Sequence, residues 1–166
     1  MARSDRPSDT PPPVAPPRLW TAAEANQRLS ELAELLPRLR AWAARLAEVH
    51  DERERLASFW GSEADAEDQP DHELKSRLDA EWKHLSHRLD EAIGALRAEG
   101  IEVKDLASGL VDFYAMESGE LVYLCWQHGE ASVEYYHTLT GGFRSRRPLP
   151  GVSKGPSVRT QTQEQP

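Results

Sequence analysis

The chain has 166 residues and a formal net charge of −8 at pH 7. This length favours a single domain, and the negative charge argues against nucleic-acid binding, which requires a basic surface. Cys125 is the only cysteine, so an internal disulfide is excluded, and no apolar run is long enough to cross a membrane. A soluble cytoplasmic protein is therefore the expected class.

The two ends of the chain are poor in large apolar residues and differ from the part between them. Residues 1–18 include six prolines, and residues 151–166 are polar and without periodicity. Such composition cannot bury enough apolar surface to offset the entropy of ordering. We therefore expect a disordered proline-rich arm at 1–18, one domain at 19–150 and a disordered tail at 151–166.

A long helical hairpin is predicted between residues 21 and 100. Thr21 and Glu24 have the spacing of a capping box, and Gly100 suits the position just past a helix end. Pro37 predicts either a kink or a break with a new helix starting there. The acidic, turn-rich segment 61–70 is the expected tip. Apolar residues recur at helical spacing on both sides of it, at Leu29, Leu32, Leu36, Leu39, Trp42, Leu46, Val49, Leu56 and Trp60, and at Leu74, Leu78, Trp82, Leu85, Leu89, Ile93 and Leu96.

Three β-strands are predicted after the hairpin, at residues 110–116, 121–127 and 132–138, and segment 101–103 has the character of a short edge strand. The connections at Ser118-Gly119 and at 128–130 are short, which favours an antiparallel meander. The expected fold is therefore α+β: a long antiparallel helical hairpin packed at its base on a small antiparallel three-stranded sheet.

Alternation along the strands predicts which side chains share a face of the sheet. The face toward the helices is predicted to be apolar, with His137 as its odd member. Its other residues are Val111, Phe113, Ala115, Val122, Leu124, Trp126, Val133 and Tyr135. With turns centred on 118–119 and 129–130, the other face carries two cross-strand rows, and a turn of odd length would invert the facing beyond it. The two rows are Asp112–Cys125–Glu134 and Tyr114–Tyr123–Tyr136.

Two carboxylates beside a thiol on a tyrosine-lined face form the candidate site. If the face is covered, one carboxylate would have a raised pKa and could act as an acid or base. Together with Cys125, the carboxylates could bind a divalent metal. His137 would join them only through a bend or bulge, and would then complete the metal-ligand set Asp112, Glu134 and His137. The competing interpretation is a solvated polar face with an inert thiol.

Arg146 is expected to close this candidate site. The Gly141-Gly142 pair lets the chain turn sharply after the last strand, so the following segment can fold back over the carboxylate face. In that position, Arg146 would pair with Asp112 or Glu134.

A set of short blocks occurs in a fixed order along the chain: Trp20-Thr21 with Glu24-Ala25-Asn26, Val103-Lys104-Asp105-Leu106, Gly109-Leu110-Val111-Asp112-Phe113, Val122-Tyr123-Leu124-Cys125-Trp126, Gly129-Glu130, Tyr135-Tyr136-His137, and Gly142-Phe143 followed by Arg146 and Pro148-Leu149. Their order and spacing resemble a bacterial family of domains of unknown function, DUF2203. Tyr114 and Tyr136 depart from its pattern, which favours proline and tryptophan there. The resemblance implies a shared domain and no particular chemistry.

No HExxH motif, nucleophile elbow, P-loop or paired CxxC occurs in the sequence. A small interaction or scaffold module is therefore the favoured function. The alternative is a metal- or thiol-dependent enzyme that uses the face of Asp112, Cys125 and Glu134, with a divalent metal as the only cofactor suggested.

Large apolar residues persist toward the expected hairpin tip, among them Leu56, Phe59, Trp60 and Leu74. A two-helix seam cannot bury them all, whereas two hairpins paired as a four-helix bundle would cover them. A homodimer through the helices is therefore predicted. The alternative is a monomer whose aromatic residues plug the tip.

Overall fold

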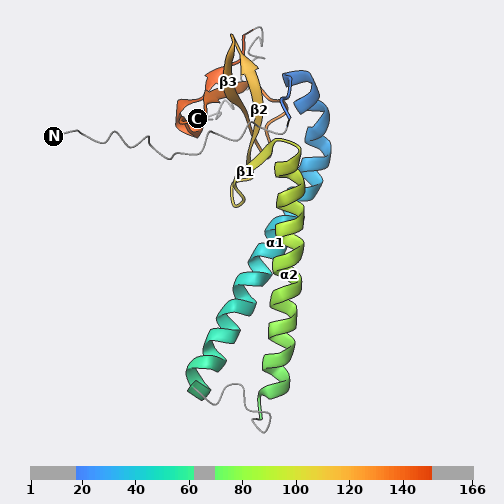
Figure 1. The fold of residues 1–166 in the computed structure, drawn as a ribbon, viewed down its shortest axis with the longest axis vertical. Coiled ribbons are helices and arrows are strands. Elements are labelled where there is room, and N and C mark those ends of the chain that lie inside the picture. Colours follow the sequence, from blue (N-terminus) through green and yellow to red (C-terminus); the bar gives the residue numbers. More distant parts are fainter. Residues whose placement is uncertain (1–17, 62–69, 151–166) are drawn as a thin grey trace, which may run out of the picture.

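The computed structural model describes residues 18–61 and 70–150. The expected arm except for Arg18, the whole expected tail and most of the expected hairpin tip lie outside these residues. Two helices form a hairpin with an antiparallel sheet at one end (Figure 1). The elements are α1 (Ala22–Trp60), α2 (His72–Ala98), β1 (Ile101–Asp105), β2 (Leu110–Glu117), β3 (Glu120–Gln127), β4 (Tyr135–Thr138), the 3₁₀ turn η2 (Phe143–Ser145) and β5 (Arg147–Pro148).

The α+β class is confirmed, but the sheet has five strands in the order β1-β2-β3-β4-β5 rather than three. The two additional strands are its edges. Strand β1 pairs with β2, and the two-residue strand β5 pairs with β4 through Tyr136 and Arg147. A two-residue strand that contains proline shows no alternation, so its pairing depends on the tertiary structure alone.

Helix α1 begins at the predicted capping box. The Thr21 side chain accepts a hydrogen bond from the Glu24 backbone N–H, and the Glu24 carboxylate accepts one from the Thr21 backbone N–H at 2.9 Å. Pro37 lies inside the helix, which continues through it, so of the two predicted alternatives, a kink or a break, the break does not occur. Figure 1 shows that α1 changes direction as it crosses α2, and an interior proline is a usual cause of such a bend.

The hairpin has two apolar clusters along its length. The larger lies between the helices and the sheet and includes Leu32, Leu36 and Leu39 of α1. The smaller lies farther from the sheet and is centred on Val49, Leu78 and Leu85. Ion pairs join the helices beside this second cluster: Arg45 to Glu81 at 2.7 Å and Arg53 to Asp79 at 2.6 Å.

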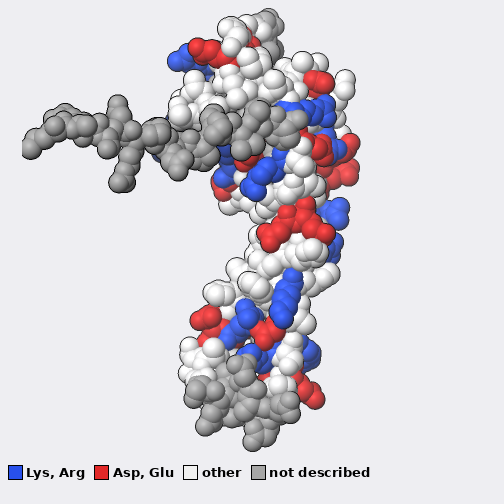
Figure 2. Space-filling view, in the orientation of Figure 1, with Lys and Arg blue, Asp and Glu red and all other residues white. Residues whose placement is uncertain are grey.

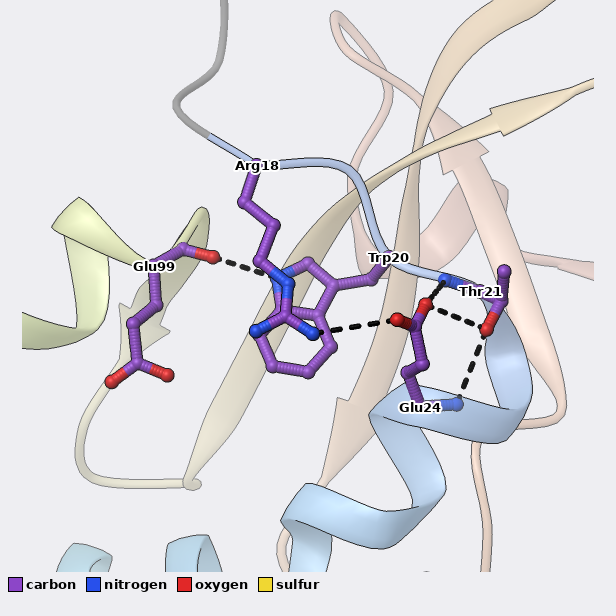
Figure 3. Close-up of polar contacts among 5 residues, drawn as sticks. All are labelled: Arg18, Trp20, Thr21, Glu24 and Glu99. Carbon is purple, nitrogen blue, oxygen red and sulfur yellow. Dashed lines mark hydrogen bonds and ion pairs between the residues drawn. The ribbon is translucent and has the colours of Figure 1, made fainter.

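Trp20 joins the start of α1 to the end of α2 and to the sheet. Its indole Nε1 donates a hydrogen bond to the Glu99 carbonyl at 2.7 Å, and its backbone N–H donates one to the Tyr114 carbonyl at 2.7 Å. The ring meets Phe113 edge-on at 5.4 Å between centroids, and the Arg18 guanidinium lies 3.7 Å from its centroid. Figure 3 shows the indole between the Arg18–Glu24 pair and Glu99.

Gly100 makes this junction sterically feasible. Its φ of +75° ends α2 in the left-handed conformation that was predicted at this position. A Cβ atom here would lie 2.5 Å from the Arg18 carbonyl oxygen. The segment before α1 can therefore approach the end of α2 only because residue 100 is glycine.

The first β-hairpin has the predicted register. Asp112 pairs with Cys125 and Tyr114 with Tyr123. Ser118 and Gly119 both have positive φ, 51° and 84°, as a two-residue hairpin turn that matches the twist of the strands requires. The apolar face of these two strands packs on the helices as predicted, through Val111, Phe113, Ala115, Val122, Leu124 and Trp126.

Within the described residues, neither helix combines the length and the apolar character needed to span a membrane.

Replacement of Trp20 by phenylalanine tests the junction. The change removes the hydrogen bond to the Glu99 carbonyl and leaves a void beside Phe113. We expect the free energy of unfolding to fall by about 2–3 kcal/mol, measured by urea denaturation. The matched variant Thr21→Ala removes only a helix cap and should cost about 1 kcal/mol. A loss for Trp20→Phe no larger than that for Thr21→Ala would show that the junction is not a principal contact.

Candidate functional site

Strand β4 pairs with β3 one residue out of the predicted register. Cys125 lies opposite Tyr135 instead of Glu134, and Tyr123 lies opposite His137 instead of Tyr136. A one-residue slip exchanges the two faces of a strand. The predicted facing is therefore wrong for Tyr135, Tyr136 and His137, and His137 lies on the same face as Asp112 and Cys125. Val133, which precedes β4, lies in the core as predicted.

The slip arises in the connection between β3 and β4, which is longer than the predicted turn. The Trp126 indole donates to the Glu130 carbonyl at 2.9 Å, and the Glu130 carboxylate accepts from the Gln127 backbone N–H at 2.8 Å. Farther along, the Val133 N–H donates to Asn26 Oδ1 of α1 at 2.7 Å, and the Val133 side chain is buried in the core. These contacts fix the length of the connection and hence the parity of β4.

Three side chains of this face meet in what we call the buried cluster: Asp112 of β2, Cys125 of β3 and His137 of β4. Their exposed fractions are 1%, 0% and 3%. One carboxylate oxygen, the thiol sulfur and one ring nitrogen all lie within 4.8 Å of one another. The sheet thus brings an oxygen, a sulfur and a nitrogen ligand together away from solvent.

His137 and Asp112 form a buried polar pair. Nδ1 of His137 lies 2.8 Å from the Thr138 carbonyl oxygen, and Nε2 lies 3.1 Å from Asp112 Oδ2. A carbonyl oxygen only accepts, so Nδ1 carries a hydrogen and donates it. The lone pair of a neutral ring is then on Nε2 and points at the carboxyl group. A proton or a metal ion between these two atoms would satisfy both.

Burial changes the acid–base behaviour of the cluster. It raises the pKa of Asp112, and the positive form of His137 opposes this shift. It also raises the pKa of the Cys125 thiol to about 12, aided by the nearby Asp112 carboxylate and opposed by Arg146. A thiol with such a pKa is almost entirely protonated near neutral pH and is a poor nucleophile.

Aromatic rings and the cations of Lys104 and Arg146 surround the cluster. Tyr123, a predicted member of the site, packs between Tyr114 at 4.7 Å and the His137 ring at 5.6 Å, measured between centroids. The Lys104 ammonium lies 4.1 Å from the centre of the Tyr123 ring. Lys104 was not predicted as a site residue, because its place over Tyr123 depends on how β1 pairs with β2.

Arg146 folds back toward the predicted face but pairs with a different acid. Its guanidinium contacts Glu130 at 2.9 Å, not Asp112 or Glu134. It also stacks on the rings of Tyr135 and Phe143, at 4.6 and 3.7 Å from their centroids. The Glu130 partner could not be expected from sequence, because the connection that places it was predicted as a simple turn.

Two predicted site residues lie elsewhere. Glu134 precedes β4, and its carboxylate accepts a hydrogen bond from the Ser132 hydroxyl at 3.0 Å. Tyr136 packs against the main apolar core on the helix-facing side. Tyr135, predicted to face the helices, takes the place beside Cys125 instead. The predicted rows are therefore correct for β2 and β3 and wrong for β4.

A second feature lies at the end of the hairpin away from the sheet. We call it the distal groove, a cavity of about 340 Å³ between the helices. Phe59 beside it is 76% exposed, and Leu74 is 37% exposed. The groove is lined by Glu52, Arg55, Leu56, Phe59, Leu74 and Leu78.

The burial of Cys125 leads to a labelling prediction. In the presence of a chelator, a thiol-reactive disulfide reagent should modify the native protein at least about 100-fold more slowly than the urea-unfolded protein, because the native thiol is enclosed and protonated. The reaction is followed by the absorbance of the released thiolate. Comparable native and unfolded rates would contradict the enclosed arrangement of the cluster.

No curated protein matches the chain, and no solved structure matches it. The protein family described as "Uncharacterized conserved protein (DUF2203)" matches residues 18–149, which span the hairpin, the sheet and every residue of the buried cluster. The chain therefore belongs to the DUF2203 family.

Proposed function

We propose that the protein is an interaction module that binds a second copy of itself through the distal groove. The observation that carries this proposal is Phe59, whose side chain is 76% exposed beside an apolar groove. Burial of one such side chain contributes about 1.5–3 kcal/mol. Exposed aromatic surface beside a groove is characteristic of binding sites.

The shape of the molecule supports a role for the hairpin in binding. Helix α1 has 39 residues, which corresponds to a length of about 58 Å. The main core reaches along α1 only as far as Leu39 and Trp42, and Figure 1 shows the rest of the hairpin extending away from the sheet. A long arm that is not needed to cover the sheet is available for contacts with another molecule.

The groove is suited to a symmetric partner. A two-fold interface must be self-complementary, because the same patch occurs on both copies. Glu52 and Arg55 lie three residues apart on the α1 side of the groove and carry opposite charges. A two-fold axis between them would place Glu52 of each copy near Arg55 of the other. Phe59 of each copy would then be available to fill the apolar part of the facing groove.

The charge pattern does not favour nucleic acid as the partner. In Figure 2, lysine and arginine side chains alternate with aspartate and glutamate along the hairpin, and this view shows no continuous basic face. The net charge of −8 also disfavours binding to the negatively charged backbone of nucleic acid.

The buried cluster gives less support to an enzyme. Cys125 is fully buried, and its pKa is raised to about 12, the reverse of what a nucleophilic thiol requires. A substrate could reach Asp112 or His137 only if the surrounding side chains moved. An interaction module therefore accounts for more of the geometry.

Replacement of Phe59 by serine tests the proposal. We expect wild-type protein at tens of micromolar to have the mass of two chains by light scattering after size exclusion, and Phe59→Ser to have the mass of one. Because Phe59 is largely exposed, the free energy of unfolding measured on dilute, monomeric protein should change by less than about 0.5 kcal/mol.

Leu139→Ser is the matched control, because Leu139 is 41% exposed and belongs to the sheet end of the molecule. This variant should remain dimeric. A wild-type mass of one chain across the whole concentration range would rule the proposal out, as would dissociation by both variants alike.

A further inference from the structure

The buried cluster has the composition of a transition-metal site. It combines the carboxylate of Asp112, the sulfur of Cys125 and a ring nitrogen of His137 within 4.8 Å of one another. We propose that these three side chains bind one divalent transition-metal ion, with Zn²⁺ as the best chemical match. The proposal does not depend on the hairpin or on its self-association.

The distances fit a tetrahedral ion after a small contraction. Bonds from zinc to nitrogen, oxygen and sulfur are about 2.0–2.3 Å, which places two ligand atoms of a tetrahedron about 3.3–3.6 Å apart. His137 Nε2 and Asp112 Oδ2 are already 3.1 Å apart. The remaining separations, at most 4.8 Å, need to shorten by only about 1 Å, which side-chain rotation can supply.

His137 is held in the orientation of a metal ligand. Histidines that bind metals usually donate their second ring N–H to a carbonyl or carboxylate, which fixes the tautomer and turns the other nitrogen toward the ion. In this protein, Nδ1 donates to the Thr138 carbonyl at 2.8 Å, and Nε2 faces Asp112. The outer partner of the ligand is therefore already in place.

A metal would also improve the electrostatics of the cluster in two ways: it would satisfy a buried oxygen atom, and it would balance the negative charges of its ligands. Asp112 Oδ1 is buried and has no hydrogen-bond partner among the described residues, and such an atom is costly unless something satisfies it. An ion bound by both oxygens of the carboxylate would satisfy it. On binding of a divalent ion, the Cys125 thiol would release its proton to solvent. The two positive charges of the ion would then neutralise the Asp112 carboxylate and the Cys125 thiolate beside a neutral histidine. The buried site would then carry no net charge of its own.

The ligand set also selects the kind of ion. Calcium and magnesium prefer sites made only of oxygen atoms, whereas a thiolate and an imidazole favour zinc and related transition metals. Three protein ligands leave one tetrahedral position for water or another ligand. Glu134, which sequence alone placed in the metal set, lies before β4 and is not part of the cluster.

Metal analysis and cobalt spectroscopy test the proposal on the full chain without a histidine tag. Protein stripped with a chelator should bind about one Co²⁺ per chain and show visible bands of tetrahedral cobalt with a thiolate-to-cobalt charge-transfer band. Zn²⁺ should displace the cobalt and raise the melting temperature. Cys125→Ser should lose the charge-transfer band and bind Co²⁺ at least about 100-fold more weakly. Loss of a residue that only hydrogen-bonds to a metal ligand typically weakens metal binding by about 10–100-fold, so loss of a ligand itself should cost more.

Glu134→Gln is the control, and its stoichiometry, spectrum and affinity should match those of the wild type. Two results would overturn the proposal, and neither depends on whether Cys125→Ser folds. The first is wild-type protein that binds no Co²⁺ or Zn²⁺ at one ion per chain. The second is bound cobalt without the thiolate charge-transfer band.

Discussion

The fold depends on the packing of one indole ring, that of Trp20. The indole hydrogen-bonds to the carbonyl at the end of α2 and meets Phe113 edge-on, and the Trp20 backbone N–H donates to β2. Other hydrogen bonds also link α1 to the sheet end of the molecule, from the Val133 N–H to Asn26 Oδ1 and from Arg40 Nε to the Leu106 carbonyl. Trp20 differs from these because it joins the start of α1, the end of α2 and β2 at one point. The left-handed Gly100 allows the segment before α1 to approach the end of α2 this closely, because any side chain at residue 100 would meet the Arg18 backbone.

The two faces of the sheet differ in the side chains that they carry and in what covers them. One face is apolar and lies on the helices, where burial of large side chains supplies the stability. The other collects a carboxyl, a thiol and an imidazole under aromatic rings, flanked by Lys104 and Arg146. Buried polar groups destabilise a protein unless they are paired, so this second face needs a proton or a cation to satisfy it. That requirement supports the proposed metal ion, and a proton shared between Asp112 and His137 would meet it as well.

The two ends of the hairpin are held together in different ways. Near the sheet, both helices contribute to the main core. Farther away, a small cluster around Val49 and the ion pairs of Arg45 and Arg53 hold the helices to each other. Surface ion pairs contribute little individually, so this half is the less stable part and has apolar surface left over. Such a region gains most from the addition of a partner.

Much of this structure follows from the sequence by itself. Local signals determine the helices: the 3.6-residue periodicity, the capping box and the glycine past α2. Another local signal, the two-residue turn at Ser118-Gly119, fixes the register of β2 with β3. The register of β4 is different, because the connection before it is held by Asn26 of α1, far away in the sequence. That contact changes the parity of β4, removes Tyr136 from the site face and brings His137 to Asp112. The sequence therefore places Asp112 beside Cys125, and only the tertiary structure decides that His137 completes the cluster.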